Sequence, residues 1–168
     1  MASTTTTTTS GPNLNQELVR PALLGLMDGT VSTLAPIFAA AQLTSSIHVF
    51  WVGLSAATGA GLSMGLAEAL SHGPEEEMDI APGWKGLTTG LGTTLGGIFH
   101  SLPFLISNIT LALIIAYIVV GTELLVISAI RWRYLKFPLW RTLVLVVGGG
   151  ALVFFLGIVL GKIGNGTI

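Results

Sequence analysis

Five side chains with the chemistry to hold a metal ion or a proton interrupt the longest apolar stretches of this chain. They are Asp28, Met64, Glu68, His100 and Glu123. Carboxylate oxygens supply charge and a thioether sulfur supplies softness, a combination that suits a divalent transition metal. An imidazole can serve as a metal ligand or carry a proton near neutral pH. We therefore take these five residues as the candidate site.

The composition indicates that the surroundings of these residues are a membrane. Hydrophobic residues make up 51% of the 168 residues and charged residues only 9%, and the mean hydropathy is +0.81. A soluble domain carries about 25% charged residues. The net charge of -1 argues against a nucleic-acid-binding function. The absence of cysteine excludes disulfides, thiolate metal sites and a cysteine nucleophile.

Five stretches are long and apolar enough to span a membrane, which takes about 20 residues each. They cover residues 21–42, 48–70, 84–106, 109–130 and 142–160. The third is less apolar and rich in Gly and Thr, and Pro103 helps to end it. The sequence thus predicts an all-α integral membrane protein with one five-helix transmembrane domain at residues 19–163. Residues 1–18 are predicted to form a disordered polar tail.

Basic residues predict the orientation of these spans. With five spans, one side of the membrane carries Arg20, Lys85, Arg131, Arg133, Lys136 and Arg141, and the other carries Lys162. The positive-inside rule then places the N-terminus in the cytoplasm. Trp84, Trp132, Tyr134 and Trp140 would form an aromatic belt on that side. A re-entrant third span would reduce the count to four and reverse the side of residues 131–141. The expected location is a bacterial inner membrane or an organellar membrane.

The spacing of the candidate residues predicts their depth. Asp28 and Glu123 are each seven residues from the cytoplasmic ends of their spans, and Met64 is six. At about 1.5 Å per residue, all three should lie roughly 10 Å below the inner surface. Glu68 should share a helix face with Met64, nearer the cytoplasm. We expect no basic residue at the depth of Asp28 and Glu123, so pairing with Arg20 is an alternative mainly for Glu68.

His100 should lie in the outer half of the third span, where it could be an exit-side ligand, a proton carrier or a hydrogen-bonded packing residue. The loop at 71–83 could concentrate cations or simply be solvated. Its charged or titratable residues are His72, Glu75, Glu76, Glu77 and Asp79. Close helix contacts are suggested by small-residue pairs with i, i+4 spacing. These pairs are Gly25/Gly29, Gly61/Gly65, Gly86/Gly90, Gly92/Gly96 and Gly157/Gly161.

Residues 61–65 match the GxSxG pattern of a hydrolase, in which the serine stands on a tight strand-to-helix turn. Here the pattern falls inside a predicted membrane helix. An intramembrane protease pairing Ser63 with His100 is the enzyme alternative, and it fits poorly because the two residues are predicted in opposite halves of the membrane. We therefore expect no enzymatic activity and no bound cofactor.

Several motifs resemble the vacuolar iron transporter family. GLMDG at 25–29 and SMGLAE at 63–68 are similar to the paired motifs of that family. The chain resembles more closely the membrane domain of the membrane-bound ferritins, through TTLGG at 93–97, HSLPFL at 100–105, EL at 123–124 and IRWRY at 130–134. The similar region runs from about residue 19 to 161.

The resemblance implies a homodimer with a pore between subunits, through which Fe2+ and often Mn2+ leave the cytoplasm in exchange for protons. It implies that Asp28 is the intramembrane aspartate of the family, Met64 its pore methionine and Glu68 the glutamate that follows. Glu123 is carried over less firmly. Plant and fungal members have a further glutamate where this chain has Ala56.

The metal-collecting domains of these relatives have no counterpart in the sequence given. The loop at 71–83 replaces a long cytoplasmic domain, and residues 1–18 are too few for a ferritin-like domain. The acidic loop or a separate metal-delivery protein could supply the metal. The leading hypothesis is a homodimeric Fe2+/Mn2+ transporter coupled to protons, embedded in lipid and without a nucleic-acid partner. The alternative is a non-transporting membrane scaffold of the same fold.

Overall fold

The computed structural model describes residues 14–71, 81–135 and 138–167, and all the regular structure in these ranges is helical. The elements are α1 (Leu14–Leu43), α2 (Ser46–Leu70), α3 (Pro82–Phe99), η1 (Leu102–Leu105), α4 (Ile109–Leu135) and α5 (Leu139–Gly164). The predicted all-α class is confirmed for the described residues. Residues 14–18, expected in the polar tail, belong to α1, so Pro21 lies inside this helix. The acidic residues of the 71–83 loop and Lys136 lie outside the described residues.

Four of the helices are long and apolar enough to cross a membrane. Their apolar segments are Leu18–Leu43, Ser46–Leu70, Ile109–Arg133 and Trp140–Gly164. These correspond to the first, second, fourth and fifth predicted spans, and each extends a few residues further than predicted. The chain is therefore a membrane protein by the length and composition of its helices.

The third predicted span is not one continuous helix. Its α-helix ends at Phe99, where the prediction extends to residue 106, and the chain turns at His100 before the single 3-10 turn of η1. Pro103 explains the break, because a proline ring clashes with the carbonyl of the residue four positions earlier, here Phe99. The break leaves His100 at a helix end rather than within a helix.

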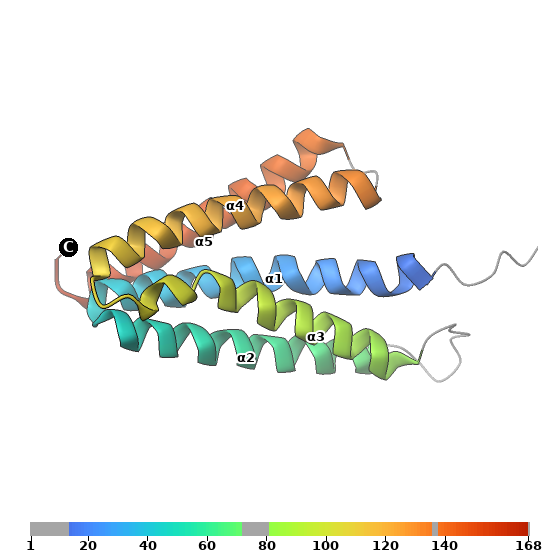
Figure 1. Ribbon diagram of the computed structural model, residues 1–168, viewed down its shortest axis with the longest axis horizontal. Helices are drawn as coiled ribbons and strands as arrows, with labels where there is room; N and C mark the ends of the chain where they lie inside the picture. Colours follow the sequence, from blue (N-terminus) through green and yellow to red (C-terminus); the bar gives the residue numbers. More distant parts are fainter. Residues whose placement is uncertain (1–13, 72–80, 136–137, 168) are drawn as a thin grey trace, which may run out of the picture.

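The helices lie along one common long axis, with α1 between the α2–α3 pair and the α4–α5 pair (Figure 1). We call the end at which α1, α3 and α5 begin and α4 ends the basic end. It carries Arg20, Lys85, Arg131, Arg133 and Arg141. The opposite end, here the far end, carries Lys162 near the end of α5. The α4–α5 pair diverges from α1 toward the basic end (Figure 1).

Glycines bring α3 into direct contact with α1 and α2. A Cβ at Gly25 or Gly29 of α1 would overlap the α3 backbone at Thr89 or Thr93. The remaining four predicted pairs also lie at helix contacts. Gly61/Gly65 meet Gly90/Gly86, Gly92/Gly96 meet the α1 backbone near Ala22 and Leu26, and Gly157/Gly161 meet Ala35/Ala39. Such contacts allow the helix backbones to approach closely.

Buried hydroxyls between α1 and α3 are satisfied by their own helices. Thr30 and Thr33 donate to the carbonyls four residues earlier in α1, at 2.9 and 2.7 Å. Thr89 and Thr93 do the same in α3, both at 3.0 Å. Because no water reaches such sites in a bilayer, each polar group needs an internal partner. This polar layer is therefore compatible with a membrane interior.

Candidate functional site

The break after α3 places His100 in a largely buried chain of hydrogen bonds. Its side chain is 0% exposed. Nδ1 lies 3.0 Å from Oε2 of Glu123 in α4. Nε2 lies 2.8 Å from the hydroxyl of Thr33 in α1. Residues from α1, from the end of α3 and from α4 thus contribute to one set of polar contacts.

The hydrogen-bond partners of His100 limit where its ring hydrogens lie. Thr33 has a single hydroxyl hydrogen, which it donates to the Gly29 carbonyl at 2.7 Å. The Thr33 oxygen is then an acceptor, so Nε2 of His100 carries a hydrogen. One further proton lies between Nδ1 and Glu123, giving either a charged imidazolium–carboxylate pair or a neutral imidazole–carboxylic acid pair. The hydrogen-bond geometry is therefore compatible with either form of the pair.

The chain of hydrogen bonds from Thr33 through His100 to Glu123 lies near the middle of the apolar segments. Thr33 is fifteen residues from Leu18 and ten from Leu43, and Glu123 is ten residues from Arg133. Thr33 is five residues beyond Asp28 along α1, or about 7.5 Å. Glu123 therefore meets His100 deeper than the predicted Asp28–Met64 layer, near the middle of these segments.

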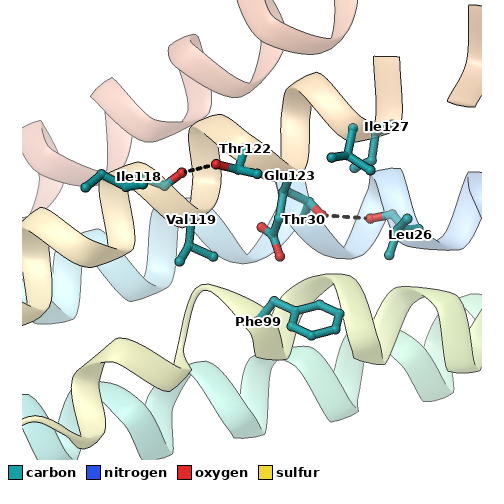
Figure 2. A pocket seen from close by; sticks show the side chains of 9 residues that line it. Leu26, Thr30, Phe99, Ile118, Val119, Thr122, Glu123 and Ile127 are labelled. Atoms are coloured by element: carbon teal, nitrogen blue, oxygen red, sulfur yellow. Dashed lines mark hydrogen bonds between the residues drawn. The ribbon is translucent and has the colours of Figure 1, made fainter. Parts of the chain in front are cut away.

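Glu123 also lines an apolar pocket, and its second carboxylate oxygen is unpaired within the part of the chain that the structure describes. Oε1 is buried and has no hydrogen-bond partner among the described residues. The pocket, of about 350 Å³, lies between α1, α3 and α4 (Figure 2). Its lining residues are Leu26, Thr30, Phe99, Ile118, Val119, Thr122, Glu123, Val126 and Ile127. A carboxylate oxygen in such surroundings is suited to bind a proton or a cation.

The other candidate residues lie apart from this pair. Asp28, Met64 and Glu68 are each half-buried, in α1 and α2. Asp28 makes no hydrogen bond or ion pair within the part of the chain that the structure describes. In the same ranges, no three His, Asp or Glu side chains gather in a group that could hold a metal ion. The structure thus brings together His100 and Glu123, and does not join the five candidates into one cluster.

Arg131 makes a contact inside the bundle that the sequence did not predict. Its Nη1 donates to Sδ of Met27, the neighbour of Asp28 in α1, at 2.9 Å. Side chains on a helix lean toward its N-terminus. Because α4 ends at the basic end, the Arg131 side chain leans back into the bundle instead of out to the surface. Applied to the sequence, this rule would have indicated that the Arg131 side chain points back into the bundle.

The structure does not pair Ser63 with His100. Ser63 is exposed on α2, and both ring nitrogens of His100 already face Thr33 and Glu123. A serine nucleophile needs a base within hydrogen-bond reach. The protease interpretation therefore gains no support from the geometry.

Comparison with models of protein families, with curated proteins and with solved structures finds no match to this chain.

Proposed function

We propose that this chain transports divalent metal ions, Fe2+ or Mn2+, out of the cytoplasm in exchange for protons. The observation that carries the proposal is the buried chain from Thr33 through His100 to Glu123, midway along helices of membrane-spanning length. Ionisable groups at such depth are expensive, and they typically mark ion pathways or proton relays. A pair that holds one proton in either of two forms is suited to a relay.

In this proposal, metal binding and proton transfer use separate side chains. Asp28, Met64 and Glu68 form the metal path, with oxygen ligands and one sulfur ligand. The resemblance to the vacuolar iron transporter family supports these roles. His100 and Glu123 carry the proton. Release of the proton leaves the His100–Glu123 pair more negative by one charge and changes the field along the pathway, which links metal movement to the proton gradient.

A five-span topology with a cytoplasmic N-terminus belongs to the proposal. In it, α3 and η1 form the third span, and the basic end faces the cytoplasm. The glycine contacts of α3 with α1 and α2 support this arrangement, as does the excess of basic residues at one end. The expected membranes are the bacterial inner membrane or an organellar one.

A homodimer completes the proposed pore. Asp28 is half-buried, without a hydrogen-bonding partner among the described residues, and a lone carboxylate facing lipid would be costly. A second copy of α1 would enclose it in a pore that metal and water share. Metal reaches the pore from the cytoplasm directly or from a separate delivery protein.

Transport into proteoliposomes tests the proposal. Wild type, Asp28→Asn and the control Lys162→Gln would be compared for Fe2+ and Mn2+ flux, with and without a proton gradient. We expect Asp28→Asn to lose at least about tenfold in flux, equivalent to about 1.4 kcal/mol in ion binding. Lys162→Gln, which removes an exposed charge at the far end, should transport normally.

A folded dimer that moves neither metal in the wild type would contradict transport and favour the scaffold alternative. Flux that ignores the proton gradient would contradict the coupling alone. Glu123→Gln separates the two roles, because it should keep metal flux and lose the response to the gradient.

A further inference from the structure

A second pocket, at the basic end, combines arginines with an apolar wall. It has a volume of about 560 Å³ and lies between α1, α4 and α5. Arg131 and Arg141 both line it, together with Trp140. Within the described ranges no Asp or Glu lines it. The pocket therefore combines two guanidinium groups with apolar lining residues.

The two guanidinium groups occupy different depths in this pocket. Arg131 is half-buried, and its contact with Sδ of Met27 at 2.9 Å places its guanidinium on the α1 side. Arg141 is exposed, with Cζ 5.9 Å from the centroid of the Trp140 ring. A guanidinium binds phosphate oxygens through paired N–H donors. The start of α5, at Leu139, adds the partial positive charge of a helix N-terminus.

The same pocket continues onto an apolar surface of α5. Val144 and Leu145 line it and are 61% and 72% exposed. A free anion would gain no favourable contact from these apolar side chains. An amphiphile would place its headgroup between the arginines and an alkyl chain along them. Trp140 beside Arg141 is typical of the interface between headgroups and acyl chains.

We propose that this pocket binds the phosphate of an anionic phospholipid in the leaflet at the basic end. Arg131 and Arg141 contact the phosphate, and an acyl chain lies along Val144 and Leu145. Basic pockets between membrane helices recognise anionic headgroups by this combination of charge and apolar contact. The bound lipid links α1 to the α4–α5 pair where these helices diverge (Figure 1).

Thermal unfolding of the purified full-length chain in detergent tests the site. Phosphatidylglycerol, phosphatidylcholine with the same chains, or inorganic phosphate would be added to wild type, Arg141→Gln and Arg20→Gln. Arg141 is exposed, so its replacement should leave folding intact, and exposed Arg20 at the same end outside the pocket provides the matched loss of charge. We expect saturating phosphatidylglycerol to raise the midpoint by about 5 °C or more in wild type and Arg20→Gln.

Arg141→Gln should lose most of this shift, and phosphatidylcholine should produce little in any variant. An equal shift from both lipids, or an equal loss in Arg20→Gln, would overturn the proposal in favour of general detergent or charge effects. A shift from inorganic phosphate as large as that from phosphatidylglycerol would make the pocket a phosphate site and contradict the lipid assignment. None of these readouts depends on metal transport.

Discussion

His100 and Glu123 stabilise the bundle and provide the proposed proton site through the same contact. Glu123 is 13% exposed and His100 is fully buried, so the bond between them is screened little by solvent. In the neutral form the pair makes the same hydrogen bond as in the charged form, with the proton on the carboxyl group. Replacements that preserve a donor toward Nδ1 should therefore affect function without affecting folding.

Substitution of Glu123 can separate these two effects. Glu123→Gln keeps an amide donor for Nδ1 of neutral His100, so we expect an unfolding free energy within about 1 kcal/mol of wild type. Glu123→Leu leaves Nδ1 buried without its partner and should cost about 1–3 kcal/mol. Chemical or thermal unfolding in detergent measures both. Equal stability of Glu123→Leu and wild type would mean that the His100–Glu123 contact contributes nothing to folding.

At the scale of elements, the position of α3 in the bundle depends on close helix contacts at glycines rather than on the hydrophobicity of α3 itself. It lies outside the four helices that are apolar enough to span a membrane by themselves. Its buried residues are small: Gly86, Thr89, Thr93, Gly96 and Gly97. Close backbone packing gives many van der Waals contacts, which drive helix association where the lipid is as apolar as the protein. The position of His100 therefore depends on the α1–α3 contact.

Two Gly→Ala substitutions with opposite expected signs test this dependence. A Cβ at Gly29 would overlap the Thr93 backbone, whereas one at Gly121 of α4 meets nothing within 4 Å. We expect Gly29→Ala to destabilise by about 1–3 kcal/mol through overpacking. Gly121→Ala should stabilise by about 0.5–1 kcal/mol through helix propensity. Unfolding in detergent reports both values, and stabilisation by Gly29→Ala would contradict the close α1–α3 packing.

At the scale of the whole molecule, the number of crossings decides which side of the membrane each end faces. The beginnings of α1, α3 and α5 share the basic end (Figure 1). If α3 and η1 cross the membrane, residues 81 and 107 face opposite compartments. If they re-enter, both face the same compartment. Only in the first arrangement do the basic residues near the starts of α1 and α3 and around the α4–α5 connection all face the cytoplasm.

Cysteine labelling distinguishes these arrangements, because the chain has no cysteine of its own. Ala81→Cys and Ser107→Cys lie at exposed positions on either side of α3 and η1. In oriented membranes we expect a membrane-impermeant maleimide to label Ala81→Cys only from the cytoplasmic side and Ser107→Cys only from the other. Thr167→Cys, after α5, should behave like Ser107→Cys. Labelling of residues 81 and 107 from one side would show that α3 is re-entrant.

Composition and local spacing were sufficient for the features that depend on nearest neighbours in the chain. The four long apolar helices follow from the requirement that a span be about 20 residues long. The five glycine pairs were identified from i, i+4 spacing, and all lie at helix contacts. The break near Pro103 was expected, although its position at Phe99 follows only from the clash of the proline ring with a carbonyl.

The tertiary structure alone decided which polar side chains meet. Thr33, His100 and Glu123 are separated by 67 and 23 residues in the sequence. Their contact depends on how α1, α3 and α4 pack and on their relative positions along the bundle axis. Hydropathy does not specify either. The same packing turned Arg131 toward Met27, because side-chain direction along a helix matters as much as depth. Residue types thus predicted a membrane site for ions or protons, and packing determined that His100 and Glu123 are the two that meet.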